Sequence, residues 1–161
     1  MNLNKFTIKS QEAVQNAQEI AQSYGNQAIE PEHLLAALVQ DAEGVVVPIL
    51  QKLGANVDYI KIKIAEALEK LPKITGAAVG NQFLGQPLNE LFDNALKEAE
   101  SLKDEYVSTE HLLLALVSLK TAAGKLLRDQ GVREKMSLAI KQRENKDAAK
   151  IVGEWLSRQC R

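Results

Sequence analysis

The chain has 161 residues, with 20 lysines and arginines against 21 aspartates and glutamates, and a formal net charge of −1 at pH 7. The two signs are interspersed and form no basic stripe, which argues against a protein that binds nucleic acid. Cys160 is the only cysteine, and neither a signal peptide nor a run of about 20 apolar residues is present, so we expect a soluble protein of the reducing cytoplasm without membrane contact.

An abundance of alanine, leucine, glutamate, lysine and glutamine, with only 4% aromatic residues, predicts an all-α fold without a sheet of consequence. The first predicted helix follows Thr7 as its N-cap, carries apolar residues at spacings of three and four, and ends before Gly25. The second runs from Pro31 to Gln40, because proline at a first helical position loses no needed N–H group.

Two further helices complete the first half of the chain. A short helix ends near Leu53, where Gly54 is the usual glycine stop. The next is capped by Asn56 and ends before Pro72. Its apolar stripe consists of Val57, Ile60, Ile64, Ala67, Leu68 and Leu71. The first half is therefore predicted to contain four helices.

Residues 72–86, PKITGAAVGNQFLGQ, are rich in glycine, lack helical periodicity and are predicted to form a linker. Phe83 and Leu84 in this linker are apolar, and we expect them to dock on the protein. Pro87 then begins a fifth helix, and Ser108 caps a sixth. At this point the pattern of the first half starts again.

The stretch EPEHLLAALV at 30–39 returns as STEHLLLALV at 108–117. A shift of 78 residues carries His33 onto His111, and it also superposes Ala17 on Ala95. A long period with two copies predicts a duplicated four-helix unit, packed about a pseudo-twofold axis. We predict that the first repeat covers 1–71 and the second 87–145, together one domain over 1–145.

The end of the chain is predicted to contain an eighth helix and a tail. The segment REKMSLAIKQ predicts an eighth helix with Met136 and Ile140 on its buried side. Asp147 is then expected to cap an additional amphipathic helix within a tail at 146–161. The role of this tail stays open: it packs on the repeats, on a second chain, or is an appendage.

Catalytic, metal and cofactor sites are not indicated. His33 and His111 are expected to be structural, because two histidines without nearby cysteines or an H-E-x-x-H pattern do not make a zinc site. The nearest match to a phosphate-binding loop, AAGKL around Gly124, lacks the upstream glycine and the hydroxyl after Lys125. An enzyme with a histidine base would need a nucleophile beside it, and the sequence offers none.

Glu32 and Glu110 have the same place in the two copies, in the first turn of a leucine-rich helix. The leucines are expected to be core. A carboxylate at a helix start serves the helix dipole, and it can also face the cations of a partner. Both roles stay open for these two glutamates.

Several stretches resemble the double repeat that begins ClpB, the bacterial AAA+ protein disaggregase. They are NKFTIKSQEAVQNAQEIA, IEPEHLLAALV, the linker after LEKLP, and DEYVSTEHLLLALV. The resemblance covers about residues 1–132. ClpC and ClpA share the repeat, but EPEH and FTIKSQEA are more similar to ClpB, since the ClpC pattern usually has Gly-Thr before the glutamate.

This resemblance implies an eight-helix domain that engages unfolded or aggregated polypeptides and passes them to AAA+ rings absent from this chain. It implies no catalysis here, a homohexameric parent protein and a monomeric isolated domain. Thr7, Asp104 and Glu110 match polar residues that the family uses to engage substrate. Each has a structural alternative, as a helix cap, a turn residue and a dipole partner, respectively.

An unfolded segment offers apolar side chains and free backbone groups, so a fitting receptor is a shallow apolar groove with a polar rim and modest affinity. The junction between the two repeats is the expected place for it. We predict Leu88 and Phe92 near this groove, together with Phe83 and Leu84, and expect some of these four to belong to the core instead.

Two other functions stay open. A ClpC-like domain would dock adaptor proteins or phosphoarginine tags near Glu32 and Glu110, because a carboxylate pairs well with a guanidinium group. A purely structural helical scaffold would instead use the tail at 146–161 to form dimers.

Overall fold

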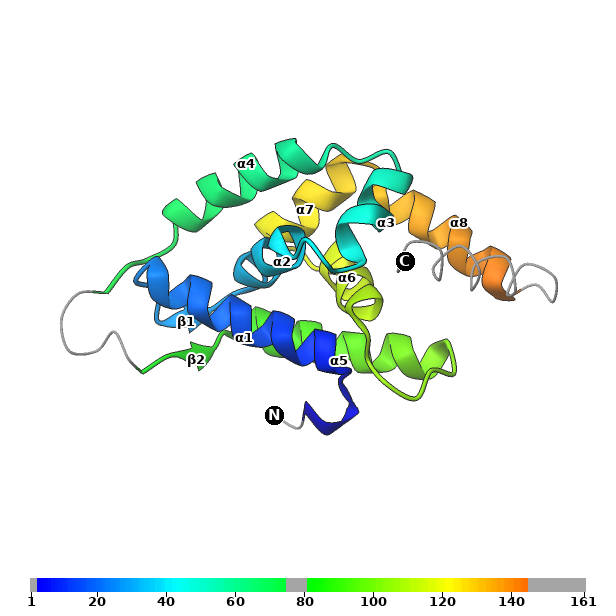
Figure 1. Ribbon diagram of the computed structural model, residues 1–161, viewed down its shortest axis with the longest axis horizontal. Helices are drawn as coiled ribbons and strands as arrows, with labels where there is room; N and C mark the ends of the chain where they lie inside the picture. The colour runs from blue at the N-terminus through cyan, green and yellow to red at the C-terminus, as the bar shows by residue number, and fades with distance from the viewer. Residues whose placement is uncertain (1–2, 75–80, 145–161) are drawn as a thin grey trace.

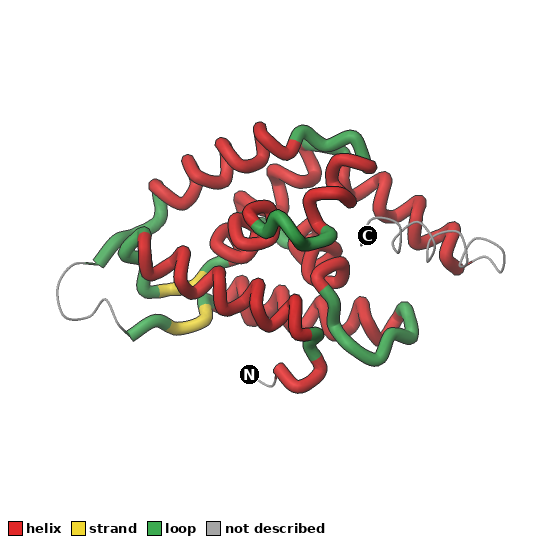
Figure 2. Tube along the Cα trace, in the orientation of Figure 1, coloured by secondary structure: helices red, strands yellow, loops and turns green. Residues whose placement is uncertain are grey.

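The computed structural model describes residues 3–74 and 81–144, and within these ranges the chain is built almost wholly from helices (Figures 1 and 2). The α-helices are α1 (Ile8–Ser23), α2 (Pro31–Gln40), α3 (Val46–Lys52), α4 (Val57–Glu69), α5 (Gln86–Ser101), α6 (Thr109–Ser118), α7 (Ala122–Asp129) and α8 (Val132–Glu144). A 3-10 helix, η1 (Leu3–Lys5), precedes α1, and two short strands are β1 (Ala28–Ile29) and β2 (Phe83–Leu84). The predicted all-α fold of two four-helix units is confirmed. The predicted tail helix lies outside the described residues.

The helix ends follow from local chemistry, as predicted. The Thr7 hydroxyl accepts the Ser10 N–H at 3.2 Å to cap α1, and the Asn56 amide oxygen accepts the Tyr59 N–H at 3.1 Å to cap α4. Gly25, after α1, has a φ of +72°, a left-handed conformation that glycine adopts without a steric cost.

Extended segments join the two halves of the chain, and the sequence did not predict them. β1 pairs in parallel with β2, so that Ile29 lies opposite Leu84. A matching bridge joins Phe6 to Val107, in which the Thr7 N–H donates to the Val107 carbonyl at 2.9 Å. The shift of 78 residues converts one pair into the other. Each segment that leads into the first helix of one copy thus pairs with the segment before the repeated helix of the other copy.

The repeated helices α2 and α6 form the centre of the core. Figure 1 shows them between α1 and α5 on one side of the molecule and α4 and α7 on the other. α2 packs on α1 and α4, and α6 packs on α5 and α7. The repeated leucines are each at most 2% exposed, as their expected core role requires: Leu34, Leu35, Leu38, Leu112, Leu113 and Leu116.

The structure corrects the placement of Leu88 and Phe92 on a binding groove. These α5 side chains are 0% and 1% exposed, and the Phe92 ring packs edge-on against Phe6 with centroids 5.6 Å apart. They face inward because they belong to the apolar stripe that α5 presents to the core. Of the linker pair, Phe83 is 54% exposed and Leu84 is partly buried against the core.

Candidate functional site

Thr7 and Glu110 lie in one groove of about 370 Å³, which we call the Glu110 groove. Its walls come from the start of α1, the loop between α2 and α3, and the start of α6. They include Thr7, Lys9, Leu38, Asp41, Glu43, Val45, Val46, Ser108, Thr109 and Glu110. The groove thus joins elements that are about a hundred residues apart in the sequence, and it lies at the junction of the two copies.

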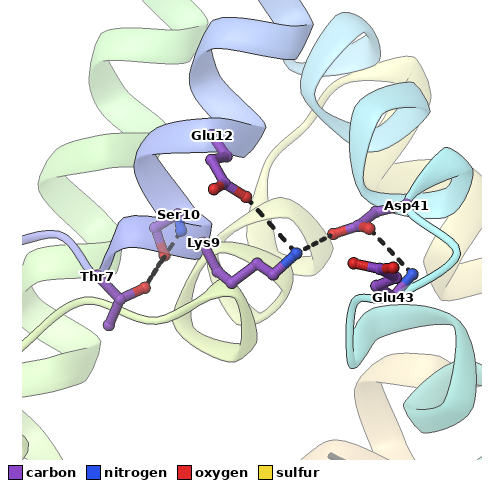
Figure 3. Close-up of polar contacts among 6 residues, drawn as sticks. All are labelled: Thr7, Lys9, Ser10, Glu12, Asp41 and Glu43. Atoms are coloured by element: carbon purple, nitrogen blue, oxygen red, sulfur yellow. Dashed lines mark hydrogen bonds and ion pairs between the residues drawn. The ribbon is translucent and has the colours of Figure 1, made fainter.

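The start of α1 is fixed to the segment before α6 by Ser10, a buried residue that the sequence analysis missed. Its hydroxyl donates to the Val107 carbonyl at 2.9 Å. The same hydroxyl accepts from the Thr7 hydroxyl at 3.0 Å (Figure 3). One signal for Ser10 exists in the sequence, since the shift of 78 residues sets this polar residue against the buried Leu88. The cap residue Thr7 is therefore also a fixed wall of the groove.

Lys9 crosses from α1 to the loop after α2, a contact that no sequence pattern indicated. Its ammonium lies 3.6 Å from a carboxylate oxygen of Asp41 and 3.5 Å from one of Glu12 (Figure 3). Asp41 in turn accepts the Glu43 N–H at 3.1 Å. Chiefly the charge of Asp41 raises the pKa of Lys9. The half-exposed pairs add little stability, but they set the position of the one ammonium group that the described residues contribute to the groove.

The charge of the Glu110 groove is predominantly negative. The described lining residues include three carboxylates, those of Asp41, Glu43 and Glu110, and one ammonium group, that of Lys9. The floor is apolar, because Leu38, Val45 and Val46 line it. The site therefore favours apolar chain segments that carry a lysine or arginine.

Asp104 does not line the Glu110 groove but lies one contact behind it. An Asp104 carboxylate oxygen is 2.8 Å from His111 Nε2, and His111 Nδ1 accepts the Ser108 N–H at 2.9 Å. In the first copy His33 makes the same two contacts, at 2.9 Å to Asn26 and at 2.9 Å from the Glu30 N–H. Both histidines are therefore structural, as expected.

Acid is expected to destabilise the domain through His33. Burial lowers its pKa from 6.5 to about 4, so this ring is neutral in the folded state and takes up a proton more readily in the unfolded state. The stability is complete above pH 6.5 and is lost, by about 3 kcal/mol, as the pH falls toward 4. Urea unfolding of the wild type between about pH 7.5 and about pH 5 measures this slope.

The Asn26→Asp variant separates His33 from the other acidic and basic groups. A carboxylate beside the ring raises the pKa of His33. The unfolding free energy of the variant should therefore fall less between about pH 7.5 and about pH 5 than that of the wild type. Parallel curves over this range would contradict the assignment to His33.

Glu32 lies in a second groove, of about 590 Å³, between α4 and α7, which we call the Glu32 groove. Glu32 is 7% exposed, and within the described part of the chain its Oε2 atom has no hydrogen-bond partner. Burial, with a smaller contribution from the Glu30 charge, raises its pKa, while a hydrogen bond to the Ala123 backbone opposes the shift. The rim carries the ammonium groups of Lys63, Lys70 and Lys125 and the carboxylates of Glu66 and Asp129. Glu32 and Glu110 are thus equivalent in the repeat but belong to separate grooves.

Across 3–74 and 81–144, no three histidine, cysteine, aspartate or glutamate side chains are grouped so as to hold a metal ion. No helix in these ranges is long and apolar enough to cross a membrane.

Comparison with known proteins accounts for the repeat. The family model of the Clp repeat (R) N-terminal domain matches residues 5–130. The chain belongs to this family. The chaperone protein ClpB of Bacteroides thetaiotaomicron is 43% identical to this Clp N-terminal domain over 135 residues, which are 84% of the chain and 15% of that protein. ClpB of Porphyromonas gingivalis is 39% identical over 136 residues, again 84% of the chain and 15% of the relative. The chain thus spans about a seventh of the length of these relatives.

Solved structures share the fold of this Clp N-terminal domain. The Hsp104 N-terminal domain from Candida albicans gives a TM-score of 0.68 at 21% identity, over 80% of the chain and 83% of that structure. The N-terminal domain of ClpD from Arabidopsis thaliana gives 0.60 at 18% identity, over 84% and 93%. The N-domain of ClpV from Vibrio cholerae gives 0.68 at 17% identity, over 84% and 85%.

Proposed function

We propose that this Clp N-terminal domain is the non-catalytic, substrate-engaging part of a ClpB-like disaggregase. It binds unfolded or aggregated polypeptides in the Glu110 groove and passes them to AAA+ rings that lie outside these 161 residues. The observation that carries this proposal is that Thr7 and Glu110, far apart in sequence, line one groove. The similarity to ClpB chaperones supports the choice of partner.

The chemistry of the groove suits a transient complex with an unfolded chain. Its apolar floor accepts apolar side chains, and its exposed rim groups pair with backbone or cationic groups. The unfolded chain loses conformational freedom on binding, so the affinity stays modest and release remains possible.

Replacing Glu110 by alanine is expected to weaken binding of an unfolded protein by about tenfold, because a charge-assisted contact is lost from the rim. The probe is ribonuclease A kept unfolded by reduction and carbamidomethylation. It is titrated into the isotope-labelled chain while the backbone amide signals are followed by NMR. Shifts should centre on Thr7, Lys9, Thr109 and Glu110.

Glu100→Ala is the matched control, since Glu100 is an exposed glutamate on α5 outside the groove. Equal binding by the two variants, both folded by circular dichroism, would contradict a role for Glu110. A folded wild-type chain that binds no unfolded ribonuclease A would overturn the proposed function.

The second candidate is a ClpC-like docking domain for adaptor proteins or phosphoarginine-tagged substrates. The specific observation is the buried Glu32 oxygen, which has no hydrogen-bond partner among the described residues and lies in a groove whose rim carries three lysines. Such a groove suits a guanidinium group at Glu32 and a phosphate at the lysines. Amide shifts around Glu32 and the start of α7 on addition of free phosphoarginine, with none from unfolded ribonuclease A, would favour this function.

A further inference from the structure

A chain of hydrogen bonds leads from Asp104 to the wall of the Glu110 groove. Asp104 contacts His111 Nε2, and His111 Nδ1 contacts the Ser108 N–H, while Ser108, Thr109 and Glu110 line the groove. The Ser108 hydroxyl also lies 2.9 Å from His111 Nδ1. His111 is only 5% exposed, so its ring is held in place by its neighbours. A shift of the Asp104 side chain would therefore move the ring and, with it, the start of α6.

The contacts of His111 define which nitrogen carries the proton. Nδ1 accepts the Ser108 N–H, so it has no hydrogen of its own. Nε2 then carries the hydrogen and donates it to the Asp104 oxygen. A neutral ring needs only an acceptor at this position, and an amide oxygen fills that role as well as a carboxylate oxygen.

The first copy of the repeat uses an amide at this position. The Asn26 amide oxygen lies 2.9 Å from His33 Nε2, and His33 Nδ1 accepts the Glu30 N–H. The start of α2 is therefore held by the same geometry without a negative charge. The chain contains its own example of the neutral arrangement.

The turn before Asp104 retains this geometry at a steric cost. Lys103 has a φ of 59°, the left-handed conformation that Gly25 adopts at the equivalent position of the first copy. In an L-residue this conformation costs about 1 kcal/mol. The turn still directs the Asp104 N–H to the Ala99 carbonyl at 2.8 Å, as Asn26 does to Ala21 at 2.9 Å. The turn therefore fixes the backbone position from which the side chain of residue 104 extends toward His111.

From these contacts we infer that Asp104 is a positioning residue for substrate engagement. It acts through His111 on the groove wall formed by residues 108–110, and its acceptor oxygen is required while its negative charge is not. The inference rests on the proposed function, because it assigns a role within the same groove. It separates Asp104 from Glu110, whose carboxylate lies in the groove itself.

The test compares the wild-type chain with Asp104→Asn, Asp104→Ala and Asp93→Ala, the last at an exposed aspartate on α5. The dissociation constant for unfolded, carbamidomethylated ribonuclease A is measured for each folded protein. Asp104→Asn and Asp93→Ala should stay within about twofold of wild type, whereas Asp104→Ala should bind about tenfold more weakly. Rescue by asparagine is the readout that a direct ionic contact would not give.

Ring nitrogen spectra of His111 and the amide signals of residues 108–110 are recorded on the same samples without ligand. Asp104→Asn should keep the Nε2–H form and the wild-type amide signals, and Asp104→Ala should shift both. A folded Asp104→Asn protein that loses as much affinity as Glu110→Ala would overturn the inference. This comparison stands even if Asp104→Ala does not fold.

The ligand-free spectra also separate the two proposals. If the wild-type chain does not bind the unfolded protein, the proposed function fails. The ligand-free amide signals of residues 108–110 still show whether Asp104 positions the start of α6. Signals at 108–110 that do not respond to Asp104→Ala would overturn the positioning role by themselves.

Discussion

Replacing Phe92 by alanine is expected to destabilise the domain by about 4 kcal/mol. The ring is 1% exposed and packs edge-on against Phe6, which itself lies in the bridge between the two copies. Truncation removes the transfer free energy of the ring and leaves a cavity beneath that bridge. Urea unfolding followed by circular dichroism measures the loss.

Phe83→Ala is the control for Phe92, because Phe83 is 54% exposed at the strand β2. Its truncation should change the unfolding free energy by less than about 0.5 kcal/mol. A cost for Phe92→Ala as small as this would show that the ring is not core. Because Phe92 does not line the Glu110 groove, the proposed function predicts that the Phe92→Ala protein that remains folded binds unfolded ribonuclease A as tightly as wild type.

Replacing Gly124 by alanine is expected to cost about 3 kcal/mol or more. Gly124 lies in the first turn of α7, where this helix crosses the end of α6. A β-carbon there would lie 2.7 Å from the Leu116 carbonyl oxygen and in steric conflict with that of Leu119. These oxygens belong to the backbone, and Arg128 holds that of Leu119 with a hydrogen bond of 2.6 Å. Neither can move away without displacing α6 or α7.

Gly131→Ala separates this close approach from the general cost of changing a glycine. Gly131 has a φ of +74°, but among the described residues no atom beyond its chain neighbours lies within 4 Å of a β-carbon at this position. Its replacement should cost only the left-handed conformation, about 1 kcal/mol. Unfolding midpoints in urea rank the two variants, and an equal loss in both would contradict the steric argument for Gly124.

The helices could be predicted because their starts and stops depend on neighbouring residues. The Thr7 and Asn56 caps and the glycine stops are each formed within a few residues of the helix end. The repeat added the equivalence of α2 and α6, since a shift of 78 residues preserves both leucines and histidines. The fold class follows from these local and periodic signals.

The groove itself could not be predicted in the same way. Its walls depend on contacts between distant segments, such as the 2.9 Å hydrogen bond from Ser10 to the Val107 carbonyl. Two-residue strands have no periodicity from which to predict their pairing. Leu88 and Phe92 were misplaced because an apolar stripe shows which residues avoid water, but not whether a helix or a partner covers them.

The reciprocal pairing of the extended segments has a consequence for the origin of the fold. Phe6 of the first copy pairs with Val107 of the second, and Leu84, in the segment that leads into the second copy, pairs with Ile29 of the first. A polypeptide with a single copy would contain both kinds of extended segment but no second copy for them to pair with. Two such polypeptides could form both pairings with each other. Within one chain the domain therefore has the arrangement of a symmetric dimer, in which each copy completes the pairing of the other.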